Sequence, residues 1–383
     1  MADATFRILD SLKGIDRADW DAVANPPGLA FDPFLSHDFL WSLEESGAAT
    51  RKTGWLAQHL VLDGDDDRLA AILPCYLKSH SMGEYVFDHG WADAYERAGG
   101  RYYPKLQAAV PFTPVTGRRL LVKEGAEALK PLLAAAGEQL TRQMRASSLH
   151  VTFAKEDDWE ALGAAGYLKR TDQQYHFVND GYRDFDDFLD ALAARKRKTI
   201  KRERRDALTG LEVRLLTGKD IDEAAWDAFF AFYMDTGSRK WGRPYLNRRF
   251  FSLVGQRMAD RILLILATHD GRPIAGALNF IGSEALYGRY WGAIEEHPFL
   301  HFELCYYQAI EWGIAHGMKV VEAGAQGEHK VARGYRPTTT HSAHYIPDPG
   351  FRRAVAEYLR TERLQVAADG EALAEYLPFK EQD

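Results

Sequence analysis

The sequence predicts an α/β (α+β) fold built as two similar units in tandem, each a mixed, mostly antiparallel sheet flanked by helices. Two observations support this prediction. Strand and helix periodicities follow nearly the same order in both halves: strand, two helices, hairpin, strand, helix and strand. The chain also has 383 residues, of which 46% are hydrophobic, and this is sufficient for two packed cores.

The first half begins with a predicted strand at residues 5–9. Asp16 and Ser36 each precede an amphipathic stretch, and both residue types are good helix N-caps. Residues 58–61 and 68–78 are then predicted to form a β-hairpin with an acidic turn.

The rest of this half is less regular. Pro74 indicates a bulge or an edge position in the second hairpin strand. Residues 101–122 contain three prolines and no regular period, so we expect an irregular segment there. The remaining expected elements are strands at 85–87, 149–153 and 167–178 and helices at 91–99, 126–145 and 157–164.

The second half follows a polar, acidic segment at residues 179–187, which we expect to link the two units. A helix is predicted at 188–208, and the Asp270-Gly271 pair indicates a tight hairpin. The other expected elements are strands at 211–216, 261–268, 274–281, 285–291, 320–321 and 344–346 and helices at 221–236, 247–259, 302–316 and 351–376.

Bulk properties exclude several classes of protein. The net charge of -7 gives no overall attraction for nucleic acid. Cys75 and Cys305 lie in apolar runs, which favours buried thiols over a disulfide. The N-terminus lacks the basic and apolar regions of a signal peptide, and no apolar run reaches membrane-spanning length. We therefore expect a cytoplasmic protein without a membrane span.

The stretch from Lys319 to Ile346 gathers reactive groups between two predicted core strands. Loops held by a rigid sheet commonly carry binding and catalytic residues, although a solvated charged loop is the alternative. The groups in this stretch are Glu322, Gln326, Glu328, His329, Lys330, Arg333, Tyr335, Arg336, His341 and His344.

A second concentration of charge lies in the predicted helix, where eight cations between Arg195 and Arg205 stand against only two acids, Glu203 and Asp206. In an acidic protein this local contrast favours a phosphate-bearing ligand, such as a nucleotide diphosphate, a lipid-linked precursor or a tRNA backbone. Arg197 and Lys201 are the candidate contacts. A solvated helix face is the alternative.

Aromatic and basic residues elsewhere extend the candidate binding surface. Tyr103 and Phe112 could line a pocket wall or could anchor their irregular segment onto the core. The other candidates are His176 in the last strand of the first half, Lys240 and Trp241 in the loop 238–245, and Tyr287 and Arg289 on one face of a strand.

Five segments carry a resemblance that covers nearly the whole chain: PKLQAAVPFTPVTGRR, Gln174-Tyr175-His176, RKRKTIKRERR, RKWGRPYLNRRFF and GAQGEHKVARGYRPTTTHSAHYI. In these segments the chain resembles the FemAB-like family of peptidoglycan biosynthesis or recognition, a branch of the GNAT acyltransferase superfamily. The resemblance implies an N-terminal GNAT-like domain at 1–180. It implies a second at 187–383, which includes the basic helix and the C-terminal helix.

The resemblance also implies an activity. Fem-type relatives transfer an aminoacyl group from aminoacyl-tRNA to an amine of a peptidoglycan precursor, and the wider superfamily uses acyl-coenzyme A. Domains that use acetyl-coenzyme A usually carry a Gly-rich pyrophosphate loop before a helix. The corresponding segment here, 292–310, lacks that loop and contains Glu295 and Glu296. The sequence thus favours a Fem-like donor, with an acetyl-coenzyme A-dependent N-acetyltransferase as the alternative.

We therefore predict acyl or aminoacyl transfer to an amine, in a cleft between the domains, with a small molecule or a muropeptide as acceptor. The attacking amine needs a base and the oxyanion needs nearby positive charge. The predicted catalytic residues are Glu322, Glu328, His329 and Lys330. The predicted substrate-binding residues are Tyr103, Phe112, His176, Arg197, Lys201, Lys240, Trp241, Tyr287, Arg289, Gln326, Arg333, Tyr335 and His344.

Three alternatives stay open. A buried ion pair between Arg289 and Glu322 would be structural rather than catalytic. A zinc site could form if Glu328, His329, His341 and His344 converged, but their spacing fits no metalloprotease motif, and we predict no metal. The chain could also be a non-catalytic binder of a cell-wall precursor or peptide, because fold does not fix function.

Overall fold

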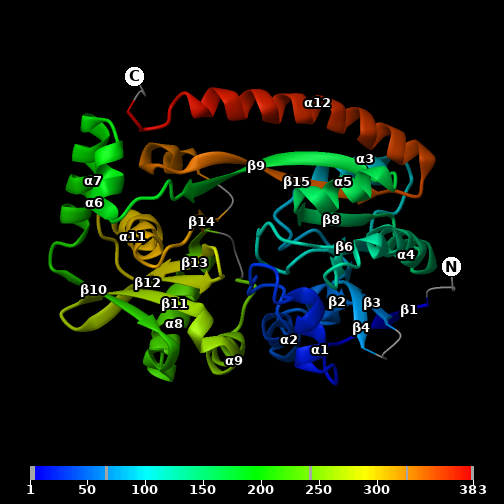
Figure 1. The fold of residues 1–383 in the computed structure, drawn as a ribbon, viewed down its shortest axis with the longest axis horizontal. Coiled ribbons are helices and arrows are strands. Elements are labelled where there is room, and N and C mark those ends of the chain that lie inside the picture. The colour runs from blue at the N-terminus through cyan, green and yellow to red at the C-terminus, as the bar shows by residue number, and fades with distance from the viewer. Residues whose placement is uncertain (1–4, 65–67, 241–243, 325–326, 381–383) are drawn as a thin grey trace. The chain divides into compact units, whose positions relative to one another are not determined.

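The computed structural model describes residues 5–64, 68–240, 244–324 and 327–380. The chain divides into two compact units: residues 1–172 with 339–368, and residues 173–338 with 369–383. The predicted domains, 1–180 and 187–383, are contiguous in sequence, whereas each compact unit takes in a second, distant segment. Each unit is described by itself below (Figure 1).

The first unit contains two sheets. One has the order β1-β3-β4-β7 and is antiparallel. The other has the order β15-β8-β6-β5-β2, in which only β6 and β8 run parallel. The strands are β1 (Phe6–Leu9), β2 (Trp55–Ala57), β3 (His59–Asp63), β4 (Leu69–Leu73), β5 (Tyr76–Lys78), β6 (Lys105–Ala108), β7 (Leu121–Val122), β8 (Leu149–Ala154) and β15 (Arg336–Tyr345).

Among the residues that the structure describes, the first unit holds five helices and most of a sixth. They are α1 (Arg17–Ala24), α2 (His37–Glu45), α3 (His89–Arg97), α4 (Lys130–Gln143), α5 (Glu156–Ala164) and α12 (Pro349–Ala374). The predicted caps are confirmed: the Asp16 side chain accepts from two backbone N–H groups of α1, and Ser36 accepts from one of α2.

Three predictions for this unit need correction. The strand expected at 68–78 divides at Pro74, which has no N–H for a ladder, and β4 and β5 enter different sheets. Residues 85–87 form no strand; Tyr85 has a positive φ of 60°, and the segment turns so that Glu84 accepts from Lys105 at 2.6 Å. The segment expected to be irregular contains β6 and β7, and all four residues of β6 are buried, so no alternation marks it.

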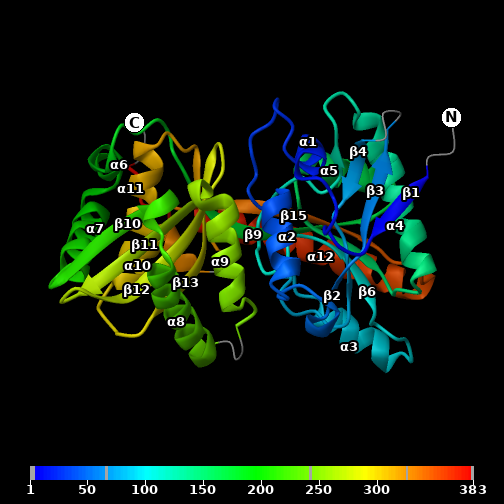
Figure 2. The same cartoon turned by 90° about the horizontal axis from the view of Figure 1, so that it is seen from below.

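In the described part of the second unit, six strands follow one another in the sheet order β10-β11-β12-β13-β14-β9; β13 and β14 pair in parallel, and the other neighbours pair antiparallel. Its helices lie on both faces: α8 and α9 on one, α11 on the other (Figures 1 and 2). The strands are β9 (Leu168–Val178), which begins in the first unit, β10 (Leu211–Thr217), β11 (Ile262–His269), β12 (Arg272–Ile281), β13 (Ala285–Ala293) and β14 (Val320–Ala323).

The helices of this unit are α6 (Phe185–Ala191), α7 (Ala194–Ala207), α8 (Glu223–Lys240), α9 (Arg248–Met258), α10 (Leu300–Phe302) and α11 (Gln308–Ala315). A π-helical segment, Glu303–Tyr307, joins the last two into one helical stretch, 300–315. Among the described residues, no helix combines the length and the apolar character that crossing a bilayer requires.

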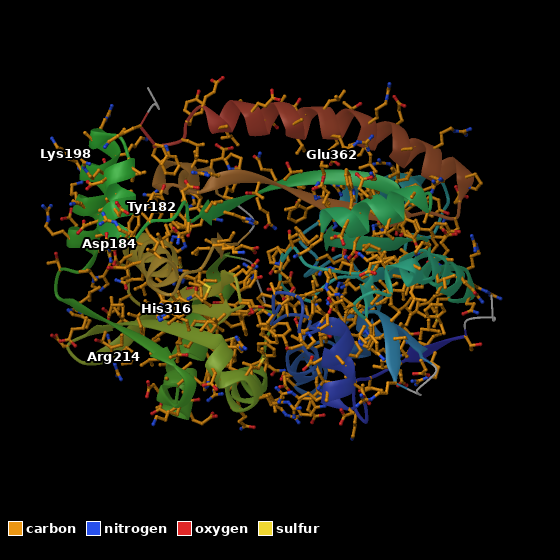
Figure 3. All side chains as sticks on the ribbon, viewed as in Figure 1. Tyr182, Asp184, Lys198, Arg214, His316 and Glu362 are labelled. Atoms are coloured by element: carbon orange, nitrogen blue, oxygen red, sulfur yellow. The ribbon has the colours of Figure 1, made fainter. Side chains whose placement is uncertain are left out.

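The helix predicted at 188–208 is divided in two. Leu192 adopts an extended ψ of 151° between α6 and α7, is fully buried, and forms a bridge with Phe379. Burial of Leu192 therefore outweighs continuation of the helix. Asp184 caps α6, and Lys198 lies on α7 (Figure 3).

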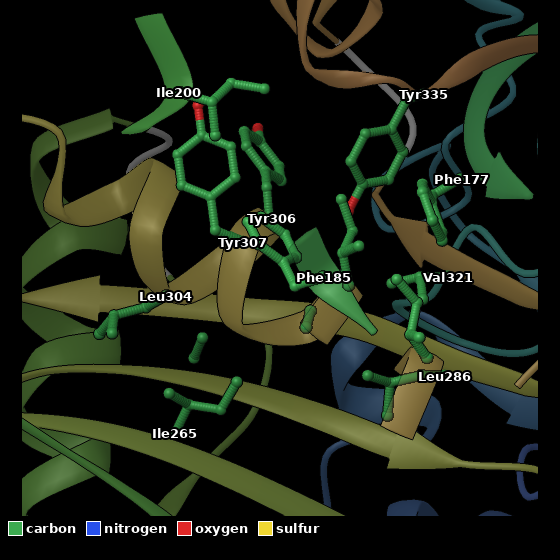
Figure 4. Packing of buried hydrophobic residues seen from close by; sticks show 14 of the residues in the cluster. Phe177, Phe185, Ile200, Ile265, Leu286, Leu304, Tyr306, Tyr307, Val321 and Tyr335 are labelled. Carbon is green, nitrogen blue, oxygen red and sulfur yellow. The ribbon is translucent and has the colours of Figure 1, made fainter. Parts of the chain in front are cut away.

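The core of the second unit lies between the sheet and the helical stretch 300–315 (Figure 4). Leu304 projects from that stretch toward Ile265 of the sheet, whereas Tyr307 projects toward Ile200 of α7, and all four residues are buried. This packing fixes the helical stretch against β11–β13, and that contact positions the candidate site.

Candidate functional site

The candidate site lies next to the point where β14 ends while its neighbour β13 continues. Their parallel ladder runs from the pair Ala285–Val320 to the pair Gly288–Ala323. β13 continues to Ala293, well beyond that last pair. A register shift against β12 also makes Arg289 the extra residue of a bulge. Bulges of this kind re-aim side chains and backbone groups, and they are frequent next to functional sites.

A hollow of about 140 Å³ opens at this point. Its lining comes from β12, β13, the end of β14 and the helical stretch 300–315, and includes Asn279, Arg289, His301, Tyr306, Ala323 and Gly324. Asn279 is fully buried, and in the described part of the chain no group donates to its Oδ1. A buried acceptor without a donor is uncommon in proteins, and a ligand could supply the missing hydrogen bond.

A buried charge cluster adjoins the hollow. Arg289 donates to Oε2 of Glu322, and their side chains are 1% and 8% exposed. His176, across the ladder from Glu322, has Nε2 3.8 Å from Oε1 of that carboxylate. Burial lowers the pKa of His176; Glu322 partly offsets this effect, whereas Arg289 and Lys330 add to it. His176 is therefore a neutral imidazole beside an ion pair near neutral pH.

Lys330 completes this cluster. Its Nζ donates to the carbonyl oxygen of Gly324 at 2.9 Å, and the residue is only 2% exposed. Burial, reinforced by Arg289, lowers the pKa of Lys330 to about 8. An appreciable fraction of its amine is consequently unprotonated at slightly alkaline pH, so this group can accept a proton.

A second buried cluster surrounds Glu203 of α7. Arg333 donates to both carboxylate oxygens of Glu203 at 3.0 Å, and the Tyr307 hydroxyl donates to the same carboxylate. Nearby, the Tyr306 hydroxyl lies 2.9 Å from Nε2 of His329. Burial, together with the charges of Arg333 and Lys330, lowers the pKa of His329, which favours its neutral form.

The cations of α7 fall into two groups. Arg197, Lys201, Arg204 and Arg205 have carboxylate partners, among them Asp190 for Arg197 and Asp186 for Lys201. Arg195, Lys196, Lys198 and Arg202 have no ion pair within the described ranges. Three of these four, Arg195, Lys198 and Arg202, line a hollow of about 420 Å³ beside Thr199. Arg195 and Lys196 also line an adjacent hollow of about 300 Å³ that reaches Arg333.

These pairings bear on the predicted phosphate contacts. Arg197 and Lys201 were expected to contact phosphate, but each already faces an acidic residue. The available charge lies on a neighbouring face of the same helix. The sequence shows how many cations the helix has, but not which of them α6 neutralises.

Three of the predicted substrate-binding residues belong to the first unit. The Tyr103 hydroxyl lies 2.7 Å from Ser81 Oγ, and its ring is half-buried. Phe112 is 2% exposed and packs edge-on against Trp55, so it is a core residue rather than a pocket wall. His344 is fully buried, with Nδ1 2.7 Å from that of His150, and it has no surface for a substrate.

The remaining predicted residues lie in the second unit. Tyr287 sits beside Arg289, with its ring 5.2 Å from the guanidinium, and Glu328 is exposed. Tyr335 is fully buried in the core, which corrects its prediction as a ligand contact. Trp241, Gln326 and the side chain of Lys240 lie outside the described residues.

The four residues of the zinc alternative are divided between the two compact units. His341 and His344 belong to the first unit and Glu328 and His329 to the second. Each imidazole has another neighbour. The ring centroids of His341 and Trp159 lie 4.5 Å apart, His329 contacts Tyr306, and His344 contacts His150.

Sequence reasoning missed Asn279, Glu203 and Tyr306. Glu203 carried a recognisable signal, because it is the one acid within a run of cations. Asn279 lies within an otherwise apolar strand, PIAGALNFI. Burial of an amide side chain costs free energy unless it is hydrogen-bonded, so this residue could have been recognised as a candidate. Tyr306 had no signal that distinguishes it from a core aromatic.

The fold defines a protein of two GNAT-like domains, with the candidate functional site in the second unit. Residues 11–381 match the model of the FemAB-like family, described as peptidoglycan biosynthesis/recognition. The chain belongs to this family.

Solved structures share this fold at low sequence identity. FemX is 15% identical, with a TM-score of 0.56 over 89% of this chain and 98% of FemX. The C-terminal domain of a putative lysylphosphatidylglycerol synthetase from Agrobacterium fabrum is 10% identical, with a TM-score of 0.51 over 90% and 95%. L-PGS from Bacillus licheniformis is 10% identical, with a TM-score of 0.50 over 86% and 98%. No curated protein sequence matches the chain.

Proposed function

We propose that this chain is an acyl- or aminoacyltransferase that moves its group onto an amine, with the reaction centred on the hollow between β13 and β14. One observation carries the proposal: the hollow combines the buried Asn279 Oδ1, the cation of Arg289 and, through Gly324, a lysine whose pKa is about 8. This combination provides polar groups for a reacting carbonyl or amine and a proton acceptor beside them.

The chemistry follows from these groups. The acceptor's ammonium first loses a proton, for which the neutral amine of Lys330 or the carboxylate of Glu322 is the base. The amine lone pair then attacks the carbonyl carbon of the donor, and the oxyanion that forms is stabilised by the charge of Arg289. A C–N bond forms in this attack; the tetrahedral intermediate then collapses with cleavage of the ester or thioester bond, the attacking nitrogen gives a second proton to the leaving oxygen or sulfur, and the proton held by the base passes to solvent.

The size of the hollow limits what it can hold. At about 140 Å³ it is smaller than the ~300–1,000 Å³ typical of sites that enclose a whole ligand. The hollow therefore takes only the reacting end of the donor. The larger, anionic part of the donor needs a separate surface.

The face of α7 that carries Arg195, Lys198 and Arg202 suits that anionic part. The Fem-type resemblance favours aminoacyl-tRNA as donor and a peptidoglycan-precursor amine as acceptor. Acyl-coenzyme A is the alternative donor. We predict, as from the sequence, that the acceptor binds in a cleft between the two domains.

A thermal-shift screen followed by a transfer assay tests the proposal. The ligands are coenzyme A, acetyl-coenzyme A, a UDP-linked muropeptide and charged tRNA, since a ligand of the native state raises its melting temperature. Transfer of a labelled aminoacyl or acyl group to the amine is then compared in Lys330→Met, Glu322→Gln and the control Lys319→Met. Lys319 is an exposed lysine paired with Glu284.

We expect loss of transfer in the first two variants and retention in the control. Stabilisation by coenzyme A with transfer from acetyl-coenzyme A would instead make the chain an N-acetyltransferase. Binding of the muropeptide with no transfer from any donor would overturn the catalytic proposal in favour of a binder.

A further inference from the structure

A cluster outside the proposed centre brings two imidazoles and a carboxylate together. His269 is the last residue of β11, and Glu295 and His297 lie in the loop that follows β13. Nδ1 of His269 and Nε2 of His297 each lie 3.2 Å from the same oxygen, Oε2 of Glu295. The three ligand atoms all lie within 4.8 Å of one another.

The backbone around these residues is well defined by the sheet. Asp270 and Gly271, with φ of 50° and 75°, form the tight turn between β11 and β12, as the sequence predicted. This turn fixes His269 opposite Arg272 in the ladder. The N–H of Ile294 donates to Ile274 at 2.9 Å, which anchors the chain immediately before Glu295.

Two of the three ligand-atom separations match a metal site: each imidazole nitrogen lies 3.2 Å from Oε2 of Glu295. Ligand atoms bound to zinc at about 2.0–2.1 Å in a tetrahedral arrangement lie about 3.3 Å apart. Imidazole nitrogens combined with a carboxylate are also the ligand types that zinc and similar divalent ions prefer, whereas calcium and magnesium prefer oxygen alone.

Arg272 contacts the other oxygen of Glu295, Oε1. It therefore orients the carboxylate while leaving Oε2 directed toward the two imidazoles. Partners of this kind, which hold a ligand without binding the ion, are usual around metal sites. The three side chains are 42%, 24% and 22% exposed, in the order His269, Glu295 and His297, so an ion can reach them from solvent.

We propose that His269, Glu295 and His297 form a binding site for a divalent ion of the zinc class, completed by water. Such an ion would cross-link the β11–β12 turn to the loop 294–299. That loop leads into the helical stretch 300–315, which lines the hollow through His301 and Tyr306. The proposal concerns binding, and it does not depend on the proposed transferase activity.

Zinc binding to the full chain, prepared without a histidine tag and stripped with a chelator, tests this site. Affinity is measured by competition with a chromogenic chelator, and stability by thermal unfolding with and without zinc. We expect one saturable site and a melting temperature that rises with zinc concentration. The double variant His269→Ala/His297→Ala should lose more than about 100-fold in affinity, because loss of a mere outer-shell partner already costs about 10–100-fold.

Two further variants separate metal binding from simpler explanations. His316→Ala removes an exposed imidazole that packs on Trp312, so it controls for surface histidines and should bind zinc as the parent does (Figure 3). Glu295→Gln keeps a hydrogen-bond acceptor for the imidazoles but removes the anionic ligand, so it should bind zinc more weakly. Equal zinc affinity in the parent and the double variant, or no saturable zinc binding by the parent, would overturn the proposal.

Discussion

At the scale of single residues, Lys330 carries an electrostatic cost that its proposed role explains. Burial lowers its pKa from 10.5 to about 8, so the folded state holds this proton less tightly than the unfolded state. Between about pH 8 and pH 10.5 the unfolded state binds more protons, and the free energy of unfolding therefore rises with pH. Below pH 8 the full penalty of a buried charge applies.

Lys330→Met should remove that penalty. At pH 7 we expect the variant to be more stable than the parent by roughly 2 kcal/mol, after about 1 kcal/mol is subtracted for the lost hydrogen bond to Gly324. The advantage should shrink as pH rises from 8 toward 10.5. Urea unfolding at pH 7 and pH 9.5 measures this difference. A variant that is less stable at both pH values would contradict the assignment of Lys330 as an energetically costly group.

Glu203 and Arg333 form a buried ion pair, unlike Lys330, whose charge has no carboxylate partner among the described residues. Each charge of the pair is stabilised by the other, so removal of one leaves the other buried and unpaired. Glu203→Gln leaves the Arg333 guanidinium without its carboxylate, and we expect a loss of about 3–5 kcal/mol in the free energy of unfolding. The double variant Glu203→Gln/Arg333→Met should recover much of that loss, because no unpaired charge remains. Chemical denaturation of the two single variants and the double variant measures the coupling; additive losses would show that the pair is not coupled.

At the scale of elements, α7 carries two groups of cations: those paired with carboxylates and those with no ion pair among the described residues. The triple variant Arg195→Ala/Lys198→Ala/Arg202→Ala removes charges that have no ion pair in the described chain. We expect it to weaken tRNA binding and to reduce the slope of log K against log salt by about 2–3, since each phosphate contact contributes about 0.7–0.9. Filter binding between low and physiological salt measures the slope.

A matched triple variant, Arg197→Ala/Lys201→Ala/Arg205→Ala, removes as many charges from the same helix but takes those with carboxylate partners. It should change the salt slope less than the first variant does. Equal effects of the two triple variants would mean that net charge alone, and not the face with Arg195, controls binding.

At the scale of the whole molecule, the compact units are not contiguous in the chain. Residues 339–368 belong with the first unit and provide part of β15, which pairs with β8, and most of α12. Phe351, Val355 and Leu359 of α12 share a core cluster with Trp91 and Tyr102. A fragment that stops at residue 180 therefore lacks one side of this cluster.

We expect the fragment 1–180 to remain unfolded or to aggregate, because it exposes the apolar surface that α12 covers. A chain that joins 1–172 to 339–368 through a flexible linker should fold cooperatively. Circular dichroism and limited proteolysis of the two fragments measure the difference. Cooperative unfolding of fragment 1–180 would instead support a contiguous first domain.

Local signals in the sequence were sufficient for much of the architecture. The caps Asp16 and Ser36, the Asp270-Gly271 turn and the amphipathic helices were all readable, because each depends on residues within a few positions of one another. The same reasoning failed for β6, because its four consecutive buried residues carry no period that distinguishes a strand from a loop.

Sequence alone determined the tandem GNAT-like fold, the family resemblance and the two regions where charge and chemistry concentrate. Only the tertiary structure decided which of those charges have partners. It placed Phe112, Tyr335 and His344 in buried surroundings, set Arg197 and Lys201 beside the carboxylates of Asp190 and Asp186, and brought Arg289, Glu322, His176 and Lys330 into one cluster. The physical reason is that burial, pairing and pKa depend on neighbours that are distant in the chain, and composition and local spacing contain no information about those neighbours.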